Sequence, residues 1–508
     1  MARTRYHGTL EPLRPRSNTI LFHDWRYVYH GTPIWKTQSG EYLGLWSQGQ
    51  VPRLARRGQD IPMGIEIRAL PGVKGKPFLV PDRPWEGAVL SPTVIRTGET
   101  YRLWYECVPP SDFGTERAGH FNVLCYAESR DGESWEKPSL GLVGFGRSKD
   151  NNIVYGGEMA AGHGYHGGSV FLDPSAGEGE RYKLIHLGFL RDDEFERIAA
   201  ERGGEVDPMV RRGHIHSAVF GATSPDGLHW TPIEEPLCLQ NSDTQNIAYY
   251  DESLERYVAY MRMWVMNRRS IGRSESRDFR RFPLPETLVW PGPDVGPSDL
   301  WYSSGKTRYP GAPDHHLMFA WRWNVATDRF HVHVLASPEG VIWTRPLSSE
   351  VLSPGPDGSW DAGGVVAGCG MVEIGREVAV PIVGFHIPHK HTRCVPLGRI
   401  AWAKWPKDRI IGLVAPEQGK FRTMLLRVKA RGLRVNIRTA EAGEARFGIS
   451  DEAGSFLEGR SPEDCDPLSG DFYDREVTWR GDPAIDHEGP IAVHVRMSHA
   501  ELFCMRFS

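Results

Sequence analysis

A short turn sequence recurs along the chain and limits the fold more than any other feature. Asp-Gly, two variable residues and Trp occur at 131–135 and 226–230. Glu replaces Asp at 339–343, and a degenerate copy lies at 277–279. Each copy follows a short segment that ends in small polar residues, such as Ser129 and Ser224. An Asp-Gly turn between two strands is typical of a β-hairpin. The repeat therefore predicts successive hairpins, in which the Trp packs the outer strand onto its own sheet.

Apolar and aromatic strands precede each copy of this turn. Further strands before them are expected to start near Ser91, Gly168, Thr244 and Trp301. The second strands are expected at Tyr101–Cys107, Tyr182–Gly188, Tyr257–Met263 and Leu317–Trp323, and a looser fifth unit at Gly363–Ile374, Glu377–Gly384 and Arg399–Lys404. Repeated units of three or four strands with almost no helical pattern predict an all-β fold, a five-bladed β-propeller.

The two ends of the chain lack the repeated units and have a different pattern of apolar and polar residues. Residues 1–83 are expected to supply a closing strand, near Ile20–Tyr29 or Glu41–Ser47. We divide the chain into a propeller, residues 1–419, and a C-terminal β-sandwich, residues 420–508, because short alternating apolar and polar segments begin there. Leu190–Pro208 is expected to hold one short helix or a loop over the propeller mouth. The sandwich strands are expected at Met424–Lys429, Leu433–Ile437, Glu444–Ile449, Arg475–Thr478, Ile491–Met497 and Leu502–Phe507.

Composition excludes several classes of protein. The net charge is -4 and no basic stripe occurs, which argues against a nucleic-acid partner. No apolar run is long enough to cross a membrane, and Met1–Arg16 lacks the apolar core of a signal peptide, so we expect a cytoplasmic protein. The 7 Cys residues are widely spaced without a CxxC pair, which disfavours a disulfide framework or a zinc knuckle.

Acidic residues stand at or just before the innermost strand of most units. In a propeller these strands converge on a central channel, so we expect the carboxylates to crowd there and some of their pKa values to rise. Glycoside hydrolysis needs one protonated and one ionised carboxyl group. The alternative is that each Asp caps a turn through its own backbone. The candidates are Asp24, Glu86, Asp243, Asp299 and Asp361, with His166 in the second unit.

A second group of charged residues lies on the second strands. Counting five residues from each strand start gives Glu106, Arg262 and Arg322. Arginine at a pocket edge can hold a carboxylate or sulfate through its paired donors. A ring of ion pairs between blades is an equally good interpretation. Trp301 either stacks on a sugar or packs in the core.

Histidines gather in several places along the chain. A bound metal is one interpretation of such clusters, but none has the spacing of a known zinc helix, and His-x-His on strands also occurs without metal. The sequence therefore does not identify particular residues as metal ligands. The clusters are His163/His166, His214/His216, His315/His316 and His386/His389/His391.

The stretch Ser91–Glu106 and the Ser-Arg-Asp-Gly-x-x-Trp turn resemble those of five-bladed propeller glycoside hydrolases of families 32 and 43. Glu463–Asp471 resembles a segment of uncharacterised bacterial family-32-like proteins. The resemblance implies an Asp base or nucleophile, a second Asp that tunes pKa values, and a Glu acid. Trp85-Glu86-Gly87 matches the context of the family 43 acid, and Asp24, Asp243 and Asp299 are candidates for the Asp roles.

These observations predict a glycosidase, exo-acting on a short oligosaccharide or terminal sugar. We expect a carbohydrate substrate and no cofactor, nucleic acid or membrane, and the sequence does not predict an oligomeric state. A lectin-like propeller and a glycoside phosphorylase remain alternatives. Two facing carboxylates would favour hydrolysis, one carboxylate beside clustered Arg would favour phosphorolysis, and no facing pair would favour binding.

Overall fold

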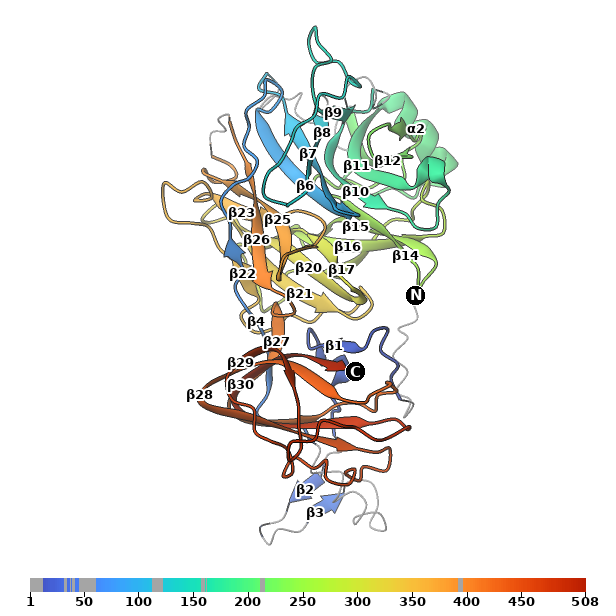
Figure 1. Cartoon of the computed structure of the whole chain (residues 1–508). Helices are drawn as coiled ribbons and strands as arrows, with labels where there is room; N and C mark the ends of the chain where they lie inside the picture. Colours follow the sequence, from blue (N-terminus) through green and yellow to red (C-terminus); the bar gives the residue numbers. More distant parts are fainter. Residues whose placement is uncertain are drawn as a thin grey trace.

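The computed structural model describes residues 12–31, 34–36, 38, 42–44, 61–111, 122–156, 160, 162–210, 215–391 and 396–508. Within these residues the fold is all-β, with one α-helix, α2 (Asp192–Glu201), where the sequence predicted a short helix or a loop. The described part has no helix long and apolar enough to cross a membrane. Figure 1 shows one body of several sheets and a second body built around the C-terminal strands.

The first body consists of antiparallel sheets that follow one another along the chain. Sheet A contains β6 (Ala88–Thr97), β7 (Thr100–Val108), β8 (Val123–Ser129) and β9 (Ile153–Gly156). Sheet B contains β10 (His166–Leu172), β11 (Tyr182–Arg191), β12 (Ile215–Ser224) and β13 (Thr231–Pro232). Sheet C contains β14 (Ile247–Asp251), β15 (Arg256–Val265), β16 (Arg268–Ser276) and β17 (Glu286–Val289). These strands confirm the predicted first and second strands of each unit.

A ten-stranded sheet completes this body and divides into two parts. In the described residues, the strand pairing between the parts is one parallel pair, Phe330 with Gly364. Part D contains β18 (Asp299–Ser303), β19 (Lys306–Tyr309), β20 (Ala312–Asn324), β21 (Arg329–Ser337) and β22 (Glu350–Leu352). Part E contains β23 (Gly364–Ala367), β24 (Val372–Ile374), β25 (Glu377–Phe385), β26 (Arg399–Pro406) and β5 (Val73–Lys74).

Hydrogen bonds between innermost strands join sheets that are distant in sequence. The Pro92 carbonyl of sheet A accepts from Cys369 N of part E at 2.8 Å and from Gln245 Nε2 of sheet C at 3.2 Å. The Gly167 carbonyl of sheet B accepts from Asn246 N at 2.8 Å. These buried polar groups find partners across the sheets, so the inner strands surround a shared centre.

The repeated turns also join neighbouring sheets. Gly227 has φ 79°, and its carbonyl accepts from the Trp230 indole of its own turn at 3.1 Å and from the Trp104 indole of sheet A at 2.8 Å. The Gly132 carbonyl accepts in the same way from the Trp402 indole of part E, at 2.7 Å. The turn therefore fixes its own Trp, as the sequence predicted, and also receives a donor from the adjacent sheet.

The second body is a six-stranded sheet made from both ends of the chain. Its C-terminal strands are β27 (Ile411–Arg422), β28 (Leu433–Ser450), β29 (Asp471–Glu476) and β30 (Ala492–Phe507). Two N-terminal strands join them: β1 (Thr19–Leu21) pairs with β30, and β4 (Glu66–Ala69) pairs with β27. The predicted division at residue 420 falls inside β27, and a sandwich of two facing sheets stays a prediction.

Neither place proposed for the closing strand pairs with the first body in the described residues, although residues 1–83 do supply one strand to it. Ile20–Tyr29 holds no closing strand of the first body, because Ile20 pairs with Met505 of β30. The part of Glu41–Ser47 that the structure describes, β3 (Tyr42–Gly44), pairs with β2 (Ile34–Lys36). The N-terminal strand that joins the first body is β5, through Val73 and Lys74.

The C-terminal segment 424–429 makes only an isolated bridge at Leu426, with Leu13 and Ile491, instead of a strand. Four other predicted segments join into two long strands: 433–437 and 444–449 both lie in β28, and 502–507 and all of 491–497 except Ile491 lie in β30. Both long strands carry register shifts, which bend them without ending them. The remaining short elements are 3₁₀ turns at Trp25–Tyr27 and Glu178–Glu180.

Gly227→Ala tests the contact between turn and neighbouring sheet. A methyl group at Gly227 would lie 2.7 Å from Trp104 Cζ2, in addition to the left-handed strain that costs about 1–2 kcal/mol. Gly98→Ala is the matched control, because Gly98 has φ 62° and nothing within 4 Å of the added atom. Urea unfolding should show a loss larger by about 1 kcal/mol or more for Gly227→Ala. Equal losses would contradict the clash.

Candidate functional site

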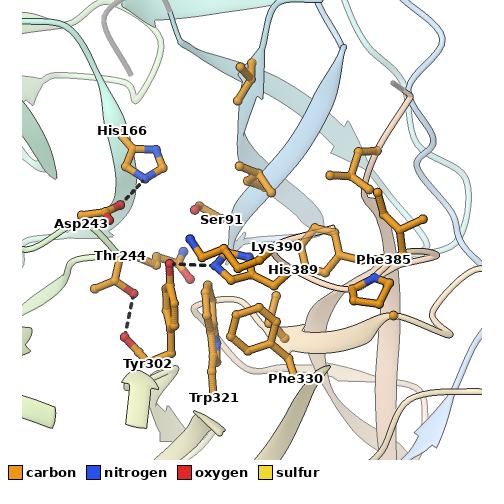
Figure 2. A pocket seen from close by; sticks show the side chains of 18 of the residues that line it. Ser91, His166, Asp243, Thr244, Tyr302, Trp321, Phe330, Phe385, His389 and Lys390 are labelled. Carbon is orange, nitrogen blue, oxygen red and sulfur yellow. Dashed lines mark hydrogen bonds and ion pairs between the residues drawn. The ribbon is translucent and has the colours of Figure 1, made fainter. Parts of the chain in front are cut away.

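A cavity of about 250 Å³ lies where the innermost strands of all five sheet units end. Figure 2 shows its wall: His166 and Asp243 on the left, Tyr302, Trp321 and Phe330 below, and Lys390 and His389 in the centre. The aromatic part is formed by Tyr302, Trp321, Phe330 and Phe385. Asp243 is the single acidic residue among the described residues that line the cavity. An apolar hollow with a few convergent polar groups is typical of a small-molecule site.

β-Bulges in three innermost strands shape this cavity. The register shifts between Leu90 and Thr93 in β6, around Gly167–Gly168 in β10, and at Tyr302 in β18. Ser91, in the first bulge, has a left-handed φ of 48°. A bulge redirects side chains next to it. Ser91, His166 and Tyr302 all line the cavity, so the bulges place three of its polar side chains.

Four charged side chains alternate in sign along one side of the cavity. His166 Nδ1 lies 2.7 Å from Glu106 Oε1, and His166 Nε2 lies 3.1 Å from Asp243 Oδ1. Arg262 Nη1 donates to Asp243 Oδ2 at 3.1 Å. The Glu106 side chain is fully buried, whereas the Asp243 side chain is 49% exposed. Asp243 is therefore the carboxylate of this charged cluster that a ligand can reach.

The cluster fixes the charge of its members. Burial opposes the charging of His166, but Glu106 and Asp243 outweigh it and hold the His166 pKa well above 6.5. Burial would raise the Glu106 pKa, yet His166, the Gly167 N–H and Asn122 lower it below the usual value. The Asp243 pKa is also lowered, because Arg262 and His166 outweigh the effect of desolvation. At neutral pH the cluster holds an imidazolium between two carboxylates.

Two arginines stack on one aromatic ring of the wall. The guanidinium carbon of Arg262 lies 4.6 Å from the Tyr302 ring centroid, and that of Arg269 lies 4.1 Å from it. The Tyr302 hydroxyl lies 3.4 Å from His389 Nε2, and the ring is stacked with Trp321 at 6.0 Å. The side of the cavity next to Asp243 is therefore rich in positive charge.

The structure brings four predicted residues together: Asp243, His166, Glu106 and Arg262. It places two other predicted catalytic residues elsewhere. Asp24 caps the turn at Trp25–Tyr27 and pairs with Arg26 at 2.8 Å, beside the C-terminal sheet. Glu86 is fully buried in sheet A, where it accepts from Tyr105 Oη and Lys137 Nζ, both at 2.8 Å.

Three further predicted residues and Arg322 also lie outside the cavity lining. Asp299 pairs with Arg322 on the adjacent strand and accepts from Asn324 Nδ2 at 2.9 Å. Asp361 pairs with Lys74 of β5. Trp301 is 2% exposed and packs between sheet C and part D, as the core interpretation had it. Asp24 caps a turn, which was the alternative for the acidic residues. Asp299 and Asp361 instead form ion pairs, an arrangement that was an alternative only for the charged residues of the second strands.

The histidine clusters do not form a metal site in the described part of the chain, where no three His, Cys, Asp or Glu side chains are grouped suitably. His315 and His316 are buried, and burial lowers the pKa of both. His214 lies outside the described residues. Six cysteines are described, and all are free thiols.

Sequence reasoning missed Tyr302 and Arg269 and assigned no role to Lys390. Tyr302 follows Trp301, and successive side chains of a regular strand point to opposite faces. Once Trp301 was assigned to the site, Tyr302 was therefore expected to point away from it. Arg269 lies on a third strand, β16, which was not considered. A search for aromatic residues beside each predicted innermost strand would have found Tyr302.

Comparisons with known proteins give similarity only at the level of solved structures. No family model matches the chain, and no curated protein matches it. Several of the similar structures are glycoside hydrolases, and the narrower resemblance to family 32 stays a prediction. At these levels of similarity the comparisons say nothing about individual residues or their chemistry.

Three of these structures illustrate the range. A glycosyl hydrolase from Bacteroides ovatus is 13% identical, with a TM-score of 0.44 over 67% of this chain and 95% of that one. A thermostable family-43 glycoside hydrolase is 13% identical, with a TM-score of 0.41 over 68% of this chain and 95% of that one. An N-acetylgalactosamine deacetylase from F. plautii is 14% identical, with a TM-score of 0.41 over 68% and 97%.

His166→Asn tests the charged cluster through its pH dependence. Because the native pKa of His166 is raised, its stabilising effect is complete below about pH 6.5 and is lost as the pH rises through the native value. The difference in unfolding free energy between wild type and variant should therefore shrink from pH 6 to alkaline pH, by about 1.4 kcal/mol for each pH unit of raised pKa crossed. Denaturant unfolding at several pH values measures it. A constant difference would contradict the proposed charge state.

Proposed function

We propose that sheets A, B and C and the two parts D and E are the blades of a five-bladed propeller whose axial cavity binds a carbohydrate. The hydrogen bonds between innermost strands support a closed ring. The aromatic wall supports a sugar ligand, because flat rings pack against the apolar faces of pyranose or furanose rings. The cavity of about 250 Å³ is small for a ligand site, which suits one terminal sugar unit and hence exo action.

We propose further that the protein is a glycosidase. The observation that carries this proposal is the half-exposed Asp243 carboxylate in the cavity wall, kept ionised by Arg262 and His166. Glycosidic bonds break through a transition state with positive charge on the sugar, which a fixed carboxylate stabilises as a base or nucleophile. His166 holds Asp243 in place, and Glu106 in turn holds His166. Asp243 is thus the catalytic carboxylate, and His166, Glu106 and Arg262 position it.

Phosphorolysis is a second candidate, favoured by one feature of the same wall. Asp243 is the one carboxylate among the described lining residues, and Arg262 and Arg269 lie close to it. A phosphate that attacks the sugar would need such cations to hold its charge. Hydrolysis needs only water at the same position, so the two candidates differ in their dependence on phosphate.

Asp243→Asn should remove activity while the fold survives. The amide keeps the shape of the side chain and loses the negative charge that stabilises the transition state, so kcat/KM should fall at least about 100-fold. The assay is a screen of aryl glycosides and short oligosaccharides. Asp193→Asn, on the exposed face of α2, is the matched control and should retain full activity. Full activity in Asp243→Asn would refute the role of Asp243.

The same screen with and without inorganic phosphate distinguishes the two reactions. A hydrolase should release free reducing sugar at a rate that phosphate does not increase. A phosphorylase should require phosphate and yield a sugar 1-phosphate. Chromatography of the products measures both, and a product that contains phosphate would replace the hydrolase proposal with the phosphorylase one.

A further inference from the structure

Bond cleavage in this cavity requires a proton donor as well as Asp243, and the inference that follows rests on the proposed glycosidase function. No second acidic residue is present among the described residues of the lining. His166 is poorly suited to give up its proton, because both ring nitrogens face carboxylates and its pKa is raised well above 6.5. Among the other polar groups of the described wall are Tyr302, His389 and Lys390.

Tyr302 places a hydroxyl group in the wall of the same cavity as Asp243. It is the extra residue of a β-bulge in β18, which turns its ring toward the cavity. Figure 2 shows the hydroxyl on the same side of the cavity as Asp243 and close to His389. The Tyr302 backbone is fixed as well, since its carbonyl accepts from Thr244 Oγ1 at 3.0 Å. The hydroxyl is thus held at the cavity surface by the strand itself.

Two cations lie over the Tyr302 ring, which also packs against the rings of Trp321, Phe330 and His389. Arg262 from β15 and Arg269 from β16 lie over the ring, at 4.6 and 4.1 Å from its centroid. Arg262 is 3% exposed, and its Nε and Nη2 have no hydrogen-bond partner in the described structure; neither has Nη1 of Arg269. Buried guanidinium donors without a partner are costly unless a π face or an anion receives them.

The Tyr302 ring provides this π face to both guanidinium groups. The titratable groups that share the cavity lining with Tyr302 are His166, Asp243, His389 and Lys390. Asp243 is already paired with Arg262 and His166. The hydroxyl of Tyr302 is thus a proton-carrying group of the cavity wall that is held among cations and lies on the Asp243 side in Figure 2.

We propose that Tyr302 is the general acid of this site. As the bond between the anomeric carbon and the leaving oxygen breaks, the Tyr302 Oη proton passes to that oxygen. The water oxygen forms the new bond to the anomeric carbon, and Asp243 takes a proton from this water. The phenolate of Tyr302 then regains a proton from solvent as Asp243 releases one, so that the net reaction consumes one water.

A series of glycosides with different leaving groups tests this role in Tyr302→Phe. Loss of a general acid should lower kcat/KM about 100- to 10,000-fold for alkyl or oligosaccharide leaving groups, which need a proton. Dinitrophenolate leaves without a proton, so kcat/KM for dinitrophenyl glycosides should be nearly the same in the variant as in wild type. Substrate affinity, measured by tryptophan fluorescence, should stay within about threefold, because phenylalanine keeps the stacked ring.

Tyr257→Phe is the matched control, because it removes a part-buried hydroxyl that donates to Asp173 at 2.8 Å, away from the cavity. It should leave activity toward both leaving groups unchanged. An equal loss of rate for both leaving groups in Tyr302→Phe, or no loss, would overturn the proposal while the glycosidase function stands. A wild-type protein inactive toward every glycoside would overturn both.

Discussion

The hydrogen bonds between innermost strands are the interaction on which the rest of the molecule depends. Each sheet alone would expose a short inner edge with unpaired backbone groups, which is costly when buried. The Pro92 carbonyl resolves part of this by accepting from residues of sheet C and part E at once. These hydrogen bonds hold the inner strands next to one another, and the bulges of β6, β10 and β18 lie at the same cavity. A site assembled from units far apart in sequence follows from this backbone arrangement.

Several buried carboxylates of the first body each pair with a cation of their own. Glu86 has Lys137, Asp299 has Arg322, and Asp361 has Lys74. Removing a charge from water is expensive unless a partner compensates, so acidic residues did not crowd together as a ring on the axis. Asp243 differs because its partners leave half of its side chain exposed. The chemistry of the cavity therefore depends on one carboxylate surrounded by donors and aromatic rings.

Much of the sheet arrangement could be predicted from sequence because the Asp-Gly turns and apolar strands carry local patterns. The cluster of Glu106, His166, Asp243 and Arg262 was also among the predicted residues. Tyr302 was not, because a bulge shifts alternation by one residue and leaves no mark in a single sequence. The predicted placement of Asp24 and Glu86 at the central channel did not hold for a different reason. In a sequence, an acidic residue before a strand has the same pattern whether it caps a turn, pairs with a buried lysine or faces a channel. The N-terminal strands were misplaced because their partners lie hundreds of residues away.

The N-terminal segment has a consequence for how the molecule assembles. β1 and β4 belong to the second body, while β5 belongs to part E of the first (Figure 1). Neither body reaches its full set of strands until residues from near opposite ends of the chain have met, and closing such long loops is entropically costly and slow. The short segment that contains β4 and β5 therefore contributes a strand to each body. Pulling on this segment, or cleaving its backbone, would remove an edge strand from both bodies at the same time.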